Sequence, residues 1–170
     1  MRSAMEIERK YLIRMPDEAL LAAMPGCEVW EIAQTYLCGC CKDYSNRVRS
    51  VRTNGTEKYI HTEKRRVSAM SARESEGEVS REEYLRLIQD ADPALRTIEK
   101  RRYRIPYAGQ LLEIDVYSFW NDRATLEIEL RDEAQQPVLP EWLDIIRDLT
   151  GEAAYKNVML AREIPMEELP

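Results

Sequence analysis

The chain lacks the features that several large protein classes require. It has no run of about 18 apolar residues, so the sequence predicts no membrane-spanning helix. It has no basic excess, because 25 Lys and Arg stand against 31 Asp and Glu, and this balance argues against a nucleic-acid binder. Charged residues occupy the N-terminal stretch where a signal peptide needs an apolar core, so we expect a cytoplasmic protein.

Histidine and cysteine are also too sparse for an ordinary structural zinc site. His61 is the only histidine, and three of the four cysteines, Cys38, Cys40 and Cys41, crowd around one glycine. Structural zinc sites commonly take four ligands as two separated pairs. We therefore interpret the cysteines as reduced thiols at a strand end, and we keep zinc or redox chemistry as the less favoured alternative.

What the chain does contain is strand periodicity. Its 170 residues suffice for one domain with a real core, which we place over residues 1–170. Alternation of apolar and polar residues predicts strands at 1–13, 29–37, 46–52, 58–65, 73–79, 97–106, 111–118 and 124–131. Amphipathic spacing and capping residues predict helices at 16–24, 80–91, 140–149 and 153–162. The expected fold class is α+β, with about eight antiparallel strands and helices outside the sheet.

Charges of one sign repeat at every second position of several expected strands. The acidic pairs are Glu6/Glu8, Glu74/Glu76, Glu113/Asp115 and Glu127/Glu129, and the basic positions are Arg47/Arg49, Lys100/Arg102 and Lys64. Charges two residues apart on a strand lie roughly 6.5–7 Å apart on one face and repel each other. One such strand is most simply a solvated face, but six in one small protein favour a ligand between them.

Closing these strands into a barrel would gather both kinds of charge in one lumen. Clustered carboxylates suit hard divalent cations, and convergent Lys and Arg side chains suit phosphate. No glycine-rich phosphate-binding loop of the Walker type is present, so side chains rather than backbone amides would hold the phosphates. The pattern therefore indicates a polyphosphate bound together with its metal.

Eight short motifs occur in order along nearly the whole chain. They are Glu6-Ile7-Glu8-Arg9-Lys10, Arg47-Val48-Arg49, Thr62-Glu63-Lys64, Glu74-Ser75-Glu76, Lys100-Arg101-Arg102, Glu113-Ile114-Asp115, Glu127-Ile128-Glu129 and Tyr155-Lys156-Asn157. Their order and strand parity resemble the CYTH superfamily, also called the triphosphate tunnel metalloenzymes. A second register would place Glu82 and Glu83 at the fourth motif. We prefer Glu74 and Glu76, because Ser80 then caps the helix that follows.

The resemblance implies an eight-stranded antiparallel β-barrel, a tunnel that binds a triphosphate with Mg²⁺ or Mn²⁺. By position it assigns Glu6, Glu8, Glu127 and Glu129 as metal ligands. It assigns phosphate binding to Lys10, Arg47, Arg49, Lys64, Lys100 and Arg102. It implies that Glu74, Glu76 and Asp115 position water or hold the ligating side chains in place.

The leading hypothesis is a metal-dependent triphosphatase acting on a small-molecule triphosphate, with inorganic triphosphate favoured among inorganic and organic substrates. Either Lys10 or Lys100 is the general base, since a lysine among other cations can have a lowered pKa. One alternative is an adenylate cyclase of class IV type, although the sequence shows no identifiable purine pocket. Another is a polyphosphate-binding module without catalysis. The sequence predicts no nucleic-acid or membrane partner and does not indicate an oligomeric state.

Overall fold

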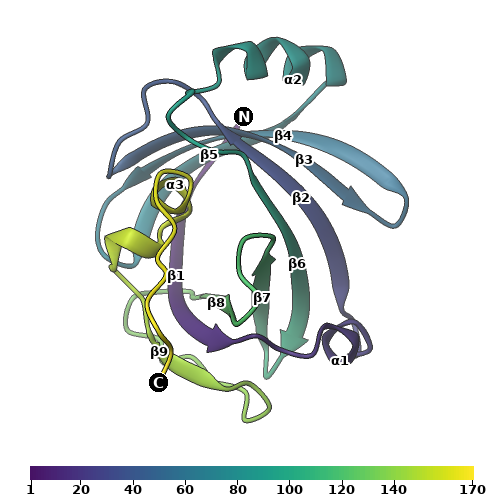
Figure 1. Cartoon of the computed structure of the whole chain (residues 1–170), viewed down its shortest axis with the longest axis vertical. Coiled ribbons are helices and arrows are strands. Elements are labelled where there is room, and N and C mark those ends of the chain that lie inside the picture. Colours follow the sequence, from purple (N-terminus) through teal and green to yellow (C-terminus); the bar gives the residue numbers. More distant parts are fainter.

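Eight strands close into an antiparallel barrel in the computed structural model, which describes all 170 residues (Figure 1). They are β1 (Arg2–Arg14), β2 (Glu28–Tyr36), β3 (Tyr44–Thr53), β4 (Thr56–Arg66), β5 (Ser71–Val79), β6 (Ile98–Tyr107), β7 (Gln110–Tyr117) and β8 (Arg123–Glu129). Their spatial order is β5-β4-β3-β2-β6-β7-β8-β1, and β5 also pairs with β1, which closes the barrel. The predicted α+β class and the eight-stranded barrel are confirmed.

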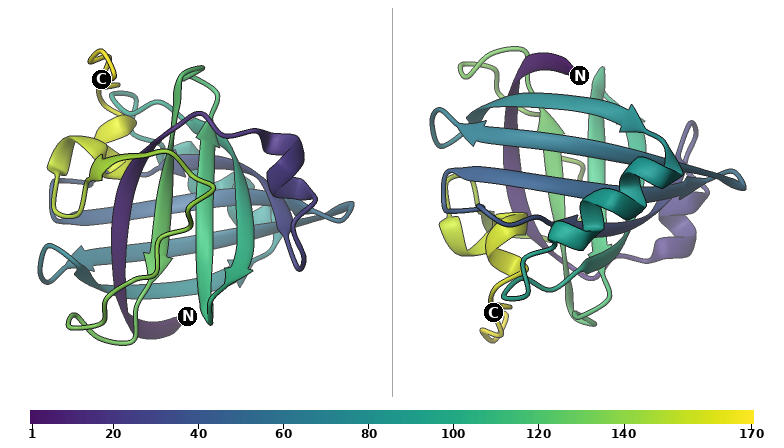
Figure 2. Two further views of the ribbon diagram at one scale, coloured as in Figure 1. Left: turned by 90° about the horizontal axis from the view of Figure 1, so that it is seen from below. Right: turned by 90° about the horizontal axis from the view of Figure 1, so that it is seen from above.

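The helices are short. Two lie outside the barrel wall (Figure 2): α1 (Glu18–Ala22), beside β6, and α2 (Arg81–Leu87), over β4 and continued by the 3₁₀ turn η1 (Ile88–Asp90). Asp17 caps α1 by accepting from two backbone N–H groups, and Ser80 caps α2 through the N–H of Glu83. These caps fix starts close to those predicted, but both helices end earlier than expected. No helix is long and apolar enough to cross a membrane.

The helix predicted over 140–149 is wrong, because this stretch contains a ninth strand, β9 (Ile145–Asp148). On one edge of β1, β5 pairs only as far as Ile7, and β9 pairs further along, at Tyr11 to Ile13. Buried backbone groups need hydrogen-bond partners, so this free edge favours a strand over a short helix. The adjacent β-branched residues Ile145 and Ile146 suit that role.

An outer core lies against one side of the barrel wall. Buried side chains of one parity on β1, β6, β7 and β8 form it, among them Tyr11, Ile105, Ile114 and Leu126. Leu21 of α1 and Leu143, just before β9, belong to the same cluster. In Figure 2 the segment before β9 crosses these strands. The charged residues that alternate with them on the same strands therefore face the inside of the barrel.

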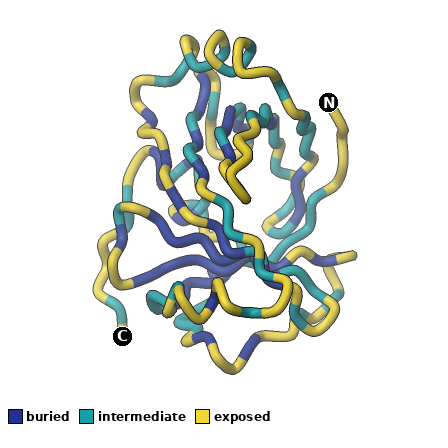
Figure 3. Tube along the Cα trace, turned by 90° about the vertical axis from the view of Figure 1, so that its right-hand side faces the viewer, coloured by how far each residue is buried: buried dark blue, intermediate teal, exposed yellow.

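A second core closes one end of the barrel. There the 3₁₀ turn η2 (Ala153–Tyr155) and α3 (Asn157–Leu160) bury Tyr155 and Leu160 against Leu12 and Tyr117. The predicted helix over 153–162 is thus two short turns separated by the extended Lys156, and it covers an end of the barrel instead of its outer wall. Figure 3 shows the buried segments gathered along the strands, with exposed turns around them.

The β3–β4 hairpin has the turn that its Asn-Gly sequence predicts. Asn54 and Gly55 have φ of 50° and 74°, the left-handed values that a two-residue hairpin turn requires. We expect Gly55→Ala to lower the free energy of unfolding by about 1 kcal/mol, because a Cβ disfavours this conformation. No atom lies within 4 Å of that Cβ position, so the loss measures backbone strain alone. Urea unfolding checks this, with Gly77→Ala in β5, where φ is not positive, as the control that should change little.

Candidate functional site

Charged side chains, at every second position of the strands, line the barrel interior. Cross-strand pairing sets acidic residues beside basic ones: Arg102 lies opposite Asp115, Arg104 opposite Glu113, and Lys64 opposite Glu74. These pairs compensate each other's charge, but Glu8 lies opposite Glu129 and Glu113 lies opposite Glu127. The like-charge repulsion expected along each single strand is therefore offset only in part across the sheet.

One cavity of about 90 Å³ opens at the end of the barrel near α3. We call it the lumen cavity. Predicted site residues lining it are Glu6, Glu8, Lys10, Arg47, Lys64, Arg102 and Glu127. They come from β1, β3, β4, β6 and β8, so strands far apart in sequence bring both signs of charge to one place. The cavity is small because these side chains contact one another.

Lys64 lies between the two acidic residues of β1. Its Nζ is 2.7 Å from Glu6 Oε2 and 3.8 Å from Glu8 Oε1. Burial works against charge at Glu6, yet the Lys64 ammonium holds the pKa of Glu6 well below its usual range. Glu8 differs, because burial and the negative charge of Glu127 raise its pKa well above normal. Lys64 therefore neutralises Glu6 more fully than Glu8.

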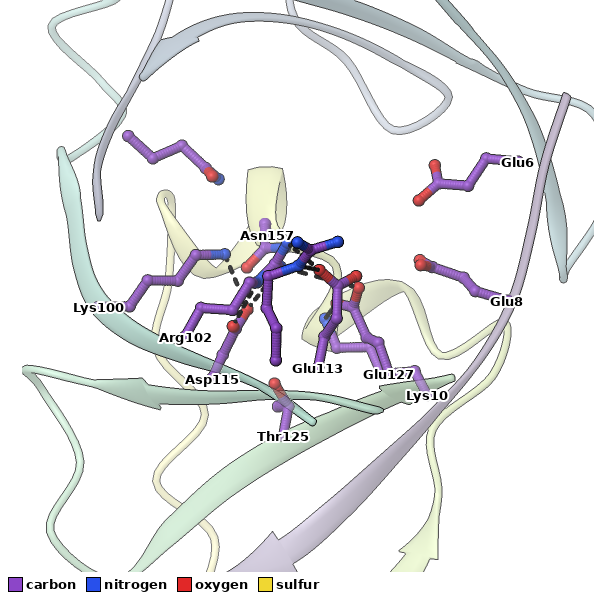
Figure 4. A network of polar contacts seen from close by, with 12 residues as sticks. Glu6, Glu8, Lys10, Lys100, Arg102, Glu113, Asp115, Thr125, Glu127 and Asn157 are labelled. Atoms are coloured by element: carbon purple, nitrogen blue, oxygen red, sulfur yellow. Dashed lines mark hydrogen bonds and ion pairs between the residues drawn. The ribbon is translucent and has the colours of Figure 1, made fainter. Parts of the chain in front are cut away.

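A buried network forms the floor of the site (Figure 4). Arg102 donates to both oxygens of Asp115, at 2.7 and 2.9 Å, and to Glu113 at 3.1 Å. Lys100 donates to Asp115 at 2.9 Å. Although burial favours a neutral acid, these two cations hold the pKa of Asp115 well below its usual range. Burial and the nearby charge of Arg102 lower the pKa of Lys100 to about 7, against the attraction of Asp115.

Lys10 joins β1 to the covered end of the barrel. Its Nζ donates to the backbone carbonyl of Tyr155 at 2.7 Å and lies 3.5 Å from Glu127 Oε1. Asn157, two residues after Tyr155, accepts a hydrogen bond from the Tyr117 hydroxyl at 2.7 Å. The turns at this end of the barrel therefore hold a residue of the charged lumen as well as the apolar core.

Arg49 and the acidic residues of β5 lie deeper in the barrel. Glu76 accepts from Arg49 at 3.1 Å and from the Thr62 hydroxyl at 2.7 Å. Burial and the negative charge of Glu6 raise the pKa of Glu74 to about 7. A second cavity opens at the other end of the barrel, lined in part by Glu6, Glu74, Glu76, Glu78 and Glu129.

The structure divides the predicted site residues into three places. Seven line the lumen cavity, as given above. Glu74, Glu76 and Glu129 line the second cavity, while Arg49, Lys100 and Asp115 are buried between strands. The alternative pair Glu82 and Glu83 lies on α2, outside the barrel.

Sequence reasoning gave Glu113 no role, although it contacts two arginines: Arg102 at 3.1 Å and Arg104 at 3.2 Å. Its position two residues before Asp115 was the available signal. It also missed Lys42 and Arg66 at the lumen cavity, which come from loop and strand-end positions that carry no periodic signal.

The donor set fits a hard divalent cation, although the side chains are not arranged around one point. The buried Oε2 atoms of Glu8 and Glu74 have no hydrogen-bond partner, and carboxylate oxygens are the ligands that Mg²⁺ and Mn²⁺ prefer. No group of three acidic, histidine or cysteine side chains is close enough to hold a metal as they stand. Lys64 lies between Glu6 and Glu8, so it must move before both can bind one ion.

Comparisons with known proteins agree with this architecture. A crystal structure described as the inorganic triphosphatase NE1496 is 28% identical with a TM-score of 0.57, and the match covers 95% of this chain and 97% of that one. PH1012 from Pyrococcus horikoshii OT3 is 23% identical with a TM-score of 0.55, over 75% and 79% of the two chains, and shows the shared fold alone. No curated protein matches the sequence. The model of the CYTH domain family matches residues 4–162, and the chain belongs to that family.

Proposed function

We propose that the chain hydrolyses a triphosphate bound in the barrel lumen together with a divalent cation, and that inorganic triphosphate is its substrate. The convergence of Arg47, Lys64 and Arg102 with the carboxylates of β1 and β8 on one cavity carries this proposal. The 28% identity to an inorganic triphosphatase over nearly the full length of both chains supports it. A triphosphate is the small anion that engages cations from several strands at once.

The polar lining favours an inorganic substrate over a nucleotide. Tyr36 lines the cavity and lies opposite Arg47 of β3, but it is only 1% exposed and its hydroxyl accepts from Gln34. Tyr44 also lines the cavity, and its ring is covered by Arg65. Neither ring is free to stack on a base, so nothing in this cavity favours the cyclase alternative.

The residues divide the work by charge. Arg47, Arg49, Lys64 and Arg102 bind and orient the phosphates. The carboxylates Glu6, Glu8 and Glu127 at this cavity would hold the cation, and Glu129, opposite Glu8 on β8, is the fourth candidate ligand. The cation would neutralise phosphate charge and polarise the phosphoryl group. Most of the rate would come from this positioning and from electrostatic stabilisation of the transition state.

A substrate panel tests the proposal. The protein is incubated with tripolyphosphate, thiamine triphosphate or ATP, each with Mg²⁺ or Mn²⁺, and phosphate, pyrophosphate and cyclic nucleotide are measured separately. We expect equal amounts of phosphate and pyrophosphate from tripolyphosphate, at a higher kcat/KM than for either organic substrate. Pyrophosphate and cyclic AMP from ATP would establish a cyclase instead, and binding without turnover would establish a binding module.

The pH profile distinguishes the two candidate bases. Lys100 faces Asp115, Arg102, Glu127 and Tyr117, and its pKa is lowered to about 7. A general base must be neutral, so the rate should rise with pH through about 7 if Lys100 accepts the proton. We expect Lys100→Arg, which stays charged, to lower kcat about a hundredfold and to remove this rise. Lys10→Arg should keep the rise; its loss there instead would assign the base to Lys10.

A further inference from the structure

Three cations lie outside the ring of predicted phosphate-binding residues, at the mouth of the lumen cavity. Lys42 comes from the β2–β3 loop, Arg66 from the end of β4, and Lys156 from the residue before α3. The Arg66 backbone N–H donates to the carbonyl of Asp43 at 2.7 Å, which holds the loop beside the strand end. Three separate segments therefore present positive charge at one opening.

These three side chains have no anionic partner. None of them takes part in an ion pair within 4.0 Å, whereas Lys10, Lys64 and Arg102 all do. Burial and the positive charges of Arg66, Lys42 and Lys64 lower the pKa of Lys156, with only Asp43 opposing them. Cations gathered in this way, with no carboxylate within ion-pair distance, are ready to bind an anion from outside the chain.

The two ends of the barrel differ in charge. The charged residues lining the second cavity, at the opposite end, are five carboxylates, Glu6, Glu74, Glu76, Glu78 and Glu129, and two cations, Arg2 and Lys58. An anion approaching that end meets an excess of carboxylates. At the α3 end Lys42, Arg66 and Lys156, with Lys64 beyond them, outnumber the acidic Asp43 and Glu152. A long anion would therefore leave its excess length at the α3 end.

We propose that Lys42, Arg66 and Lys156 form a subsite for the phosphates of an inorganic polyphosphate that extend beyond the three in the lumen. The inference rests on the proposed function. It adds that the mouth selects for the number of phosphates in the polyphosphate. Each further phosphate carries negative charge and several acceptor oxygens, which match ammonium and guanidinium donors. The mouth has no free aromatic ring to favour a nucleoside in the same place.

Binding of tripolyphosphate and tetrapolyphosphate tests the subsite. Dissociation constants are measured by calorimetry at fixed ionic strength with excess chelator, for the unaltered protein and for Lys42→Ala/Arg66→Ala. We expect the unaltered protein to bind tetrapolyphosphate about tenfold more tightly, a difference of about 1.4 kcal/mol. The double variant should lose this preference while its affinity for tripolyphosphate changes less than threefold.

A matched variant controls for net charge. Lys58→Ala/Arg81→Ala also removes two exposed cations, at the second cavity and at the start of α2, and should keep the preference. Two results would overturn the subsite alone. The unaltered protein could bind tripolyphosphate tightly but show no preference for tetrapolyphosphate, or Lys42→Ala/Arg66→Ala could lose the same factor in affinity for both anions. If neither anion binds the unaltered protein, either in chelator or with Mg²⁺ present, both the subsite and the proposed function are wrong.

Discussion

Replacing Asp115 with alanine is expected to lower the free energy of unfolding by about 3–5 kcal/mol, the cost of leaving buried charges without a partner. Asp115 is fully buried and accepts from Lys100 once and from Arg102 twice. Its removal leaves the ammonium of Lys100, whose side chain has no exposed surface, without an ion-pair partner. Urea unfolding followed by circular dichroism measures the loss.

A surface ion pair provides the control for this prediction. Asp144 lies 2.9 Å from Arg14, and both side chains are largely exposed, at 65% and 42%. Exposed pairs contribute about 0–1 kcal/mol, so Asp144→Ala should change stability little. Similar losses for the two variants would mean that the floor network is far better solvated than its burial indicates.

The same contacts give Arg102 two roles. It lines the lumen cavity, where it can meet phosphate, but it is also fixed by Asp115 and Glu113. Arg47 has no ion-pair partner, and its buried Nε lacks a hydrogen-bond acceptor. The Nε of Arg47 is therefore a buried donor free for a ligand, whereas Arg102 is already held in place by its carboxylate partners.

Period-two alternation allowed most of the barrel to be predicted, because it depends only on neighbouring residues. It placed Glu6, Glu8 and Lys10 on one face, and the Asn54-Gly55 pair located a hairpin. The segment 140–149 was predicted wrongly because its apolar spacing suits either a helix or a strand. What decides the outcome there is the free edge of β1, which no local pattern reveals.

The same limit applies to the site. Parity within a strand predicts which residues share the lumen, but the identity of each partner depends on register between strands. Asp115 meets Arg102 because β6 and β7 pair in that register. The division into two cavities also depends on where η2 and α3 pack, and so it could not be predicted from charge patterns.

Phosphate and metal binding should be coupled in this lumen. Lys64 contacts Glu6 at 2.7 Å, and Lys10 contacts Glu127 at 3.5 Å. When a triphosphate takes over these cations, the carboxylates lose their partners, and a divalent cation can replace them. Such coupling is reciprocal, so each ligand should raise the affinity for the other.

Glu6→Gln is expected to separate the two ligands. With Mg²⁺ present, turnover of tripolyphosphate should fall about a thousandfold, because one carboxylate of the proposed metal site is lost. With excess chelator, the same variant should bind tripolyphosphate about tenfold more tightly than the unaltered protein. The reason is electrostatic: the variant removes a negative charge near the anion and frees Lys64 from the shorter of its two ion pairs. Calorimetry in chelator measures the second effect independently of activity.

Glu63→Gln provides the matched control. Glu63 is the residue before Lys64 on β4, so it has the opposite parity, and it accepts from the Tyr44 hydroxyl at 3.3 Å. Its replacement makes the same change of charge on the other face of the strand and should leave both measurements nearly unchanged. If Glu6→Gln weakened tripolyphosphate binding in chelator, Glu6 would support the anion site directly, and the exchange of partners at Lys64 would be wrong. A thousandfold loss of turnover together with tighter metal-free binding is the combination expected of a carboxylate that serves the cation and not the anion.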